Sequence, residues 1–484
     1  MKYSLKPIDA KKQEADMLFL YGDETAERSL PLGRKEIELL KKRREEKRDQ
    51  LLVFDRLPHH LYVLSFDSEK PAPECQEKLR RSMMEVLKRL EADKVEELVL
   101  TGEGVLPEEV AAAVEGLTLA DYSFDRYCSK ERYHLQSLVV DSIYLKPEEL
   151  ESSQRLWNRV YWCREWVNLP GQDFNASEFA DELASIAADF PDVECTVMDK
   201  RQIESLRMGG LLAVNRGSVD EPRFVVIEYR PQSVAKEKPI CLVGKGVMYD
   251  TGGLNIKPDD YMQEMKSDMA GAATMASVLF AAADNHLPVH LIVLLPLTDN
   301  RPGFNAYAAD DILTMYDGTT VEVVNTDAEG RLILADAIAY ASRNYDPRLI
   351  VDAATLTGAA VRAISTFGIA AMQTNATNPM AMLKIVGEQV FERIVEFPMW
   401  EEYDELLKSD YADLRNCGTT PQAGTITAGK FLSHFAHEVP YIHLDIAGVA
   451  YFTKPQHFYR AGASGYGIRL LYAFLQMQEI MESK

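Results

Sequence analysis

The segment PICLVGKGVMYDTGGLNIKP, residues 239–258, begins with a continuous apolar run that leads directly into a loop of charged residues and glycines. A run of this kind indicates a strand that is buried on both faces of a sheet. Lys245 stands at the end of the run, followed by Asp250, a double glycine that permits a tight backbone path, and Lys257. These charges form either a salt bridge at the rim of the sheet or part of a binding site. A phosphate-binding loop is not favoured, because neither GxxxxGK[ST] nor GxGxxG is complete.

Apolar runs of the same kind alternate with helix-like segments from about residue 170 onward. Buried strands separated by helices are typical of an α/β domain, so we predict a mostly parallel central sheet flanked by helices for residues 171–484. The expected strands are 223–229, 239–246, 288–297, 348–355 and 441–448. The expected helices include 269–284, 331–344 and 426–438.

The N-terminal part alternates shorter strand-like and helix-like segments, which predicts a second, smaller α/β domain over residues 1–150. Residues 151–170 then show a helical pattern that contains three tryptophans and ends at the sequence LPG. We expect this segment to be a helix that packs on a core and links the two domains.

The composition disfavours two kinds of partner. The 484 residues have a formal net charge of -22 at pH 7 and a pI near 5.0, and such a surface repels nucleic acids and anionic membranes. Residues 34–50 differ, because eight basic residues stand among five acidic ones. A solvated helix face with interleaved charges is expected there, and a nucleic-acid patch is the alternative.

The chain shows no signal-peptide pattern and no stretch of transmembrane length, and none of its six cysteines forms a CxxC pair. Scattered cysteines are typical of reduced thiols in the cytosol. We therefore predict a cytoplasmic protein without membrane association.

Two further segments place acidic residues next to predicted helices. In MKSDMAGAA (265–273), Asp268 directly precedes an alanine-rich helix, where an ordinary capping role is the alternative to a functional one. In NTDAEGRLILADA (325–337), Asp327, Glu329 and Arg331 alternate, and alternating residues of an extended segment project to one side. An acidic helix cap with an internal ion pair is the alternative for this segment.

The three segments together supply four carboxylates and two lysines near predicted strand ends. Ligands of open α/β sheets bind at the carboxyl ends of strands, so we expect the segments to share one crevice. Four carboxylates would repel one another there, whereas two divalent cations about 3.5–4 Å apart with bridging carboxylates would remove the repulsion. HExxH is absent, so a zincin is excluded and mostly oxygen ligands are expected.

The motif NTDAEGRL (325–332), with VGKGVMYDTGG, MKSDM and the intervals between them, resembles the leucyl aminopeptidase family, also called the cytosol aminopeptidases. The resemblance covers about residues 150–475, and further similar segments are DAATLTGA (352–359), FPMWEEY (397–403), ITAGKFL (426–432) and HLDIAG (443–448). It implies a dinuclear metallo-aminopeptidase that cuts single residues from peptide N-termini. It also implies a macro-like N-terminal domain.

The resemblance further implies a role for each motif residue. The ligands of the tighter metal would be Lys245, Asp250, Asp268 and Glu329. The ligands of the exchangeable metal would be Asp250, Asp327 and Glu329, with the backbone carbonyl of Asp327. Lys257 and Arg331 would be the two catalytic positive charges. Lys245 can ligate only when neutral, so its pKa must fall well below about 10.4.

In the mechanism that the resemblance implies, a metal-bridging hydroxide attacks the scissile carbonyl, whose oxygen lies against one metal and Lys257. The substrate's free amine binds the other metal and Asp268. Arg331 would hold a bicarbonate ion as general base, because an arginine stays protonated and cannot itself accept the proton.

By the same resemblance, the pocket for the first substrate side chain would involve Met265, Thr355, Gly358, Ala447 and Ala450. Small and apolar residues there favour Leu-like or Met-like first residues, although Met265 alone could equally be a core residue. The Leu356 carbonyl and the Gly358 amide would hold the peptide backbone. Leu254, Asn255 and Ala270 depart from the family's usual pattern.

The family resemblance implies a homohexamer. Zinc is the expected metal, with manganese or magnesium as alternatives at the exchangeable site, because oxygen ligands suit them. A DNA-binding regulator built on the same scaffold is the alternative function, against which the net charge argues.

Overall fold

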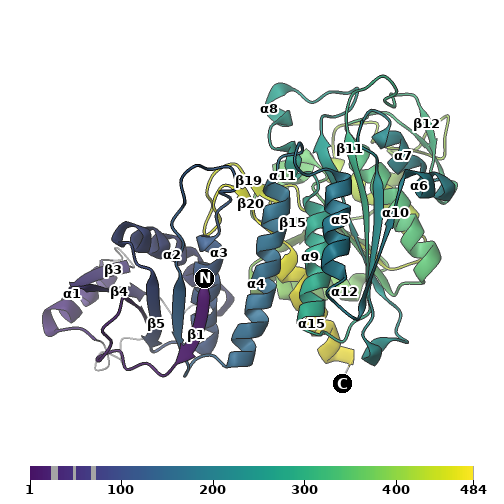
Figure 1. Cartoon of the computed structure of the whole chain (residues 1–484). Helices are drawn as coiled ribbons and strands as arrows, with labels where there is room; N and C mark the ends of the chain where they lie inside the picture. Colours follow the sequence, from purple (N-terminus) through teal and green to yellow (C-terminus); the bar gives the residue numbers. More distant parts are fainter. Residues whose placement is uncertain (23–30, 47–50, 67–71, 483–484) are drawn as a thin grey trace. The chain divides into compact units, whose positions relative to one another are not determined.

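The computed structural model describes residues 1–22, 31–46, 51–66 and 72–482, and Cα positions divide the chain into two compact units (Figure 1). The first unit comprises Met1–Asn158 and Phe452–Gly462, and the second comprises Arg159–Tyr451 and Ala463–Lys484. The division falls inside helix α4 (Pro147–Asn168). The segment Phe452–Gly462 returns to the first unit, and no pattern in the sequence predicted this return. The ranges 1–150, 151–170 and 171–484 stay predictions of the domain boundaries.

The described residues of the first unit contain a six-stranded sheet in the order β1-β6-β5-β2-β4-β3. Its neighbours pair in parallel except β3 with β4. The strands are β1 (Lys2–Lys6), β2 (Met17–Tyr21), β3 (Leu51–Arg56), β4 (His59–Ser65), β5 (Glu97–Glu103) and β6 (Ser137–Asp141). All five residues of β2 are buried, as expected for an apolar strand with a neighbour on each side. Helices α2 (Ala72–Asp93) and α3 (Pro107–Asp121) pack against each other.

Helix α1 (Arg34–Glu45) contains most of the basic segment, and its charges pair with one another and with a neighbouring strand. Arg34 lies 3.3 Å from Glu38, and Arg56 lies 2.6 Å from Glu36. This pairing fits the predicted solvated helix face. Residues 47–50 of the segment lie outside the described part of the chain.

The second unit contains, among its described residues, a nine-stranded sheet in the order β16-β15-β18-β14-β9-β11-β8-β7, with β10 beside β11. The central strands β18, β14, β9 and β11 are parallel, whereas β8 and β15 are antiparallel to their central neighbours. The strands are β7 (Val193–Met198), β8 (Arg223–Tyr229), β9 (Ile240–Gly244), β10 (Gly246–Asp250), β11 (Leu291–Asn300), β14 (Leu349–Ala354), β15 (Ile369–Thr374), β16 (Ile394–Glu396) and β18 (Tyr441–Asp445).

Helices cover both faces of this sheet, which makes the central strands apolar throughout. Figure 1 shows α9 (Ala270–Asp284) lying along one face, together with α5 (Ala176–Ala187), α12 (Thr377–Val390) and α15 (Ile468–Glu482). The other face carries α6 (Lys200–Leu206), α7 (Gly209–Asn215), α10 (Glu329–Tyr345) and α14 (Gly424–Ala436). The short helix α11 (Gly358–Ile364) follows β14, and α13 (Glu402–Glu405) packs on α14. No helix in the described ranges is both long and apolar enough to cross a membrane.

The site-bearing edge of the sheet depends on a close approach of α9. A Cβ atom on Gly271, in the first turn of α9, would lie 2.1 Å from the Ala353 carbonyl oxygen, so only glycine allows this packing. The start of α9, and with it Asp268, is thereby held against the ends of β9 and β14.

Candidate active site

The predicted site residues come from the carboxyl edge of the sheet. Lys245 directly follows β9, and Asp250 is the last residue of β10. Asp268 ends the helical turn at Met265–Ser267 that precedes α9, whereas Glu329 is the first residue of α10. The contacts of Lys245 with Asp268 and Glu329 therefore bring three separate segments together at the end of β9.

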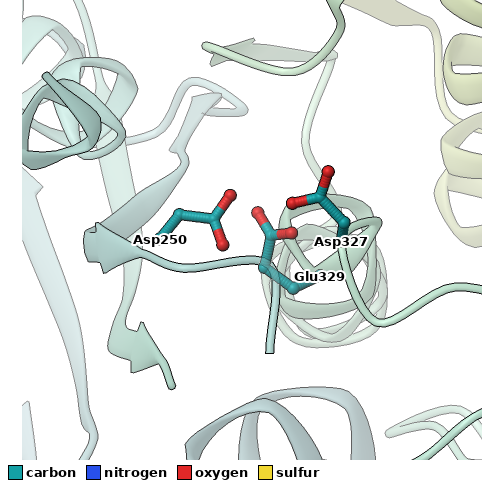
Figure 2. Close-up of side chains that lie close together, drawn as sticks. All are labelled: Asp250, Asp327 and Glu329. Atoms are coloured by element: carbon teal, nitrogen blue, oxygen red, sulfur yellow. The ribbon is translucent and has the colours of Figure 1, made fainter. Parts of the chain in front are cut away.

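Three carboxylates meet at this edge (Figure 2). Asp250, Asp327 and Glu329 each offer an oxygen, and these oxygens all lie within 4.8 Å of one another. Asp250 and Glu329 are 2% and 1% exposed, so neither can be solvated by bulk water. Buried carboxylates this close are stable only with counter-charges between them.

Two lysines supply such charges within the protein itself. The Lys245 ammonium lies 2.8 Å from Asp268 Oδ1 and 2.9 Å from Glu329 Oε1. The Lys257 ammonium lies 2.7 Å from Asp250 Oδ2 and 2.6 Å from Asp327 Oδ1. Lys245 therefore connects Asp268 to the three-carboxylate cluster, although Asp268 is not itself one of the three.

The loop that carries Lys257 is a tight turn. Gly252 and Gly253 have φ angles of +86° and +66°, a region that residues with a side chain avoid. The Lys257 amide then donates to the Thr251 carbonyl at 2.9 Å, which closes the loop. The double glycine thus returns the chain so that Lys257 faces Asp250, the residue that ends β10.

The electrostatics of the protein atoms alone show how strongly the groups act on one another. Burial, together with the charge of Glu329, raises the pKa of Asp250 to about 6. Burial also raises the pKa of Asp268 well above its usual value. Burial opposes ionisation of Glu329 too, but Lys245 and Lys257 outweigh it and hold its pKa below the ordinary value.

The pKa values of the two lysines are raised, whereas a neutral lysine ligand requires a lowered pKa. Burial lowers the pKa of Lys245, but the charges of Asp268 and Glu329 outweigh it and raise the pKa overall. The pKa of Lys257 is raised in the same way, chiefly by Asp250. A neutral Lys245 therefore requires divalent cations that neutralise these carboxylates in its place.

The donor set fits two divalent cations. Four carboxylates offer hard oxygen ligands from three segments, and buried Asp268 Oδ2 has no hydrogen-bond partner in the described part of the chain. An orphaned, buried carboxylate oxygen next to a lysine is costly unless a cation binds it. The arrangement therefore suits a carboxylate-bridged pair of divalent ions such as Zn, Mn or Mg.

Asn300 is a site residue that the sequence analysis missed. It ends β11, is fully buried, and its amide nitrogen lies 2.8 Å from Asp250 Oδ1 and 3.5 Å from Glu329 Oε2. The same nitrogen donates to the Thr326 carbonyl at 3.0 Å. The signal was present, because LTDN places polar residues at the end of an apolar strand, as at Lys245.

Asn255, one of the departures from the family pattern, joins two site loops. Its Oδ1 accepts from the Thr326 amide at 2.8 Å, and its own amide donates to Thr326 Oγ1 at 2.8 Å. Thr326 Oγ1 also donates to the Gly252 carbonyl at 2.6 Å. The loop that carries Lys257 and the loop that carries Asp327 are therefore fixed to each other.

Arg331 lies in the first turn of α10 and is 7% exposed. One terminal nitrogen donates to the Asn416 carbonyl at 2.9 Å, while Nε has no partner among the described residues. A guanidinium cannot accept a proton, so its free donor suits an anion.

The predicted substrate-pocket residues come from three segments. Thr355 and Leu356 lie in the loop between β14 and α11, Gly358 is the first residue of α11, and Thr355 Oγ1 donates to Asp268 Oδ1 at 2.8 Å. Met265 lies in the turn before Asp268 and is half-buried. Ala447 and Ala450 follow β18, where Ala447 is half-buried and Ala450 is buried. The structure links Thr355 directly to Asp268, and the segments that carry Gly358 and Ala447 follow the parallel neighbours β14 and β18.

A parallel α/β core with clustered carboxylates and lysines at its carboxyl edge defines a metal-dependent hydrolase. The profile of the "Cytosol aminopeptidase family, catalytic domain" matches residues 161–472. Two relatives named "Probable cytosol aminopeptidase" are 41% identical over 382 residues, in Syntrophotalea carbinolica, and 43% identical over 387 residues, in Chlorobaculum tepidum. Each alignment covers 76–77% of this chain and 76% of the relative. The chain belongs to the cytosol aminopeptidase family and is an aminopeptidase, which confirms the predicted family and class of enzyme.

Solved structures agree with this assignment. A tomato leucine aminopeptidase mutant superposes with a TM-score of 0.86 at 25% identity, covering 99% of this chain and 96% of that one. The bottromycin maturation enzyme BotP in complex with Mn superposes with a TM-score of 0.83 at 28% identity, covering 96% and 100%. The predicted two-domain α/β fold is thereby confirmed.

Proposed function

We propose that this enzyme hydrolyses the N-terminal peptide bond of peptides whose first residue is Leu-like or Met-like, using two divalent cations. The observation that carries the proposal is the cluster of Asp250, Asp327 and Glu329, with oxygens within 4.8 Å of one another and lysines on both sides. Two bound cations would lower the pKa of a water held beside them toward neutral and would polarise the scissile carbonyl.

Asp250 and Glu329 would each hold both ions, which is supported by their shared cluster with Asp327 and by the lysine that each one contacts. Asp268 and a neutral Lys245 would complete the tighter site. Asp327, which is 32% exposed at its side chain, would complete the exchangeable one with its carboxylate and its carbonyl. Zinc is the expected metal, and the Mn complex of BotP supports manganese as an alternative.

Asp268 and Lys257 would bind opposite ends of the scissile unit. The free oxygen of Asp268 would accept from the substrate's α-amine. Lys257, 14% exposed at its side chain, would donate to the carbonyl oxygen as negative charge develops on it. Because these groups are fixed by the loop contacts already described, they require little rearrangement in the transition state.

Arg331 would hold bicarbonate, which acts as the general base. The support is its Nε, which has no partner in the part of the chain that the structure describes, and its anchoring to the Asn416 carbonyl, which together orient a permanent positive charge. The water oxygen would bond to the carbonyl carbon, the C–N bond would then break, and the proton taken from the water would leave with the amine of the shortened peptide.

The preference for the first residue would be set by the pocket of Met265, Thr355, Gly358, Ala447 and Ala450. Small residues leave room for a branched or linear apolar side chain, and such a pocket discriminates by about 1–3 kcal/mol per methylene. A homohexamer in the cytoplasm completes the proposal, and light scattering would measure its mass.

The test is hydrolysis of Leu-, Met-, Glu- and Lys-amides before and after chelation, followed by addition of Zn or Mn. We expect Leu and Met amides to be cleaved fastest, activity to vanish on chelation, and a metal to restore it. Asp327→Asn should abolish restoration, whereas Asp181→Asn, on the exposed face of α5, should not. Full activity in chelator would contradict the proposal.

A further inference from the structure

We propose that Asp445 is a positioning residue that fixes the backbone groups which hold the peptide beyond the scissile bond. The inference rests on the proposed function and on the expectation that the Leu356 carbonyl and the Gly358 amide hold the peptide backbone, which we assign to the part beyond the scissile bond. Asp445 is not a member of the metal cluster, and it lies at the end of β18 with 1% exposure.

The hydrogen bonds of Asp445 converge on the substrate loops. Its Oδ1 accepts from the amides of Leu356 at 3.3 Å, Thr357 at 3.4 Å and Ala447 at 3.2 Å. Its Oδ2 accepts from Thr357 Oγ1 at 2.7 Å and from Thr425 Oγ1 at 3.2 Å. One buried carboxylate therefore connects both pocket loops and the start of α14.

The strand register explains why this residue can reach both loops. β14 and β18 are parallel neighbours with Ala354 opposite Asp445, and the Ile446 amide donates to the Ala354 carbonyl at 2.8 Å. The segments that follow the two strands leave the sheet side by side. A carboxylate at the last position of β18 then lies between them.

Thr357 extends the contact into helix α11. It is the N-cap residue, and its Oγ1 accepts from the Ala360 amide at 3.0 Å while donating to Asp445. The amide of Gly358, at the first helical position, has no acceptor within its own helix. Asp445 and Thr357 thus orient the loop so that the Gly358 amide and the Leu356 carbonyl are available to a peptide.

The five donors carry no formal charge, so Asp445 acts through the geometry of the loops rather than by pairing with a cation. Removing it leaves three buried amides without their acceptor, and the loop must move to satisfy them. KM should therefore rise more for substrates that extend beyond the scissile bond than for substrates that end there.

The test compares a tripeptide, Leu-Gly-Gly, with Leu-p-nitroanilide, which has no peptide unit beyond the scissile bond. In Asp445→Ala, we expect KM for the tripeptide to rise about tenfold more than KM for the anilide, the equivalent of one or two neutral hydrogen bonds. Metal content should stay at the wild-type value. Asp445→Asn keeps an acceptor for the amides and can donate to both threonine hydroxyls. Its KM for the tripeptide should therefore stay close to the wild-type value.

Thr357→Val provides a second variant in case Asp445→Ala does not fold, and it should show a smaller selective rise in KM for the tripeptide. Equal losses for both substrates, or loss of bound metal, would overturn the role of Asp445. If the wild-type enzyme cleaves neither substrate, the proposed function fails, and that result is distinct from failure of this inference.

Discussion

A Cβ atom on residue 330 would lie 2.3 Å from Cε of Lys245 and 2.7 Å from its Nζ, so Gly330 and Lys245 are packed against each other without free space. Gly330 is the second residue of α10, next to Glu329. The glycine of the NTDAEGRL motif therefore has a physical role, because it lets the lysine reach the carboxylates.

Gly330→Ala should displace Lys245 from Glu329. We expect weaker binding of one metal and loss of most activity, at a stability cost of about 1–3 kcal/mol for the overpacked methyl. Metal titration and thermal unfolding would separate the two effects. Gly171→Ala is the matched control, because the atoms nearest its added Cβ lie 3.7 Å away, at ordinary van der Waals distance.

Lys245→Met should remove a ligand while keeping the apolar stem of the side chain. Because Asp268 Oδ1 and Glu329 Oε1 both lose a partner within 3 Å, the tighter metal should bind more weakly. Mass spectrometry of dialysed protein should then find about one metal per subunit instead of two. Two retained metals would remove Lys245 from the ligand set.

Asn300→Leu should weaken metal binding by roughly 10- to 100-fold, as loss of a group that orients ligands usually does. The amide contacts both Asp250 and Glu329, the two expected bridging residues, so both metals should be affected. Competition with a chelator of known affinity would measure the change. Unaltered affinity would mean that the carboxylates are oriented by the lysines alone.

The sequence predicted the central strands and helices closely, because continuous apolar runs are required where helices cover both faces of a sheet. The strand expected at 223–229 is β8 (Arg223–Tyr229), and the helix expected at 269–284 is α9 (Ala270–Asp284). The antiparallel position of β15, the separate strand β10 and the excursion at 452–462 were not predicted. These depend on which strands pair over long distances, and local periodicity contains no such information.

The same limit applies to the site. Asp250, Asp327 and Glu329 stand in dense polar motifs, and the structure brings them together. Asn300 and Asp445 also end apolar strands, but the side chains and amides that they contact are set only by the pairing of those strands with their neighbours. Their roles become visible once the register is known.

The raised pKa of buried Asp336 leads us to expect a pH dependence of stability that is independent of the metal site. It lies in α10 and accepts from the amides of Leu211 at 2.9 Å and Tyr316 at 2.8 Å. Burial outweighs these donors and raises its pKa to about 7. Because the folded state holds this proton more tightly than the unfolded chain, the contribution to stability is full below about pH 4 and is lost as the pH rises toward 7.

The loss at pH 8 is at most about 4 kcal/mol from this one group. Asp336→Asn cannot ionise, and it offers one acceptor oxygen where Asp336 accepts from two amides with two oxygens. We therefore expect the wild type to be the more stable protein near pH 4.5 and to lose that advantage by pH 8. Urea unfolding in chelator at several pH values would measure the difference in the free energy of unfolding between wild type and variant. The contributions of the other carboxyl groups are common to both proteins and cancel in this difference. Asp413→Asn should behave oppositely, because hydrogen bonds from the Thr320 amide and hydroxyl lower the pKa of Asp413, and its contribution is lost only in acid. A difference between wild type and Asp336→Asn that stays constant from pH 4.5 to 8 would show that Asp336 is ionised throughout, and that its two amide donors outweigh its burial.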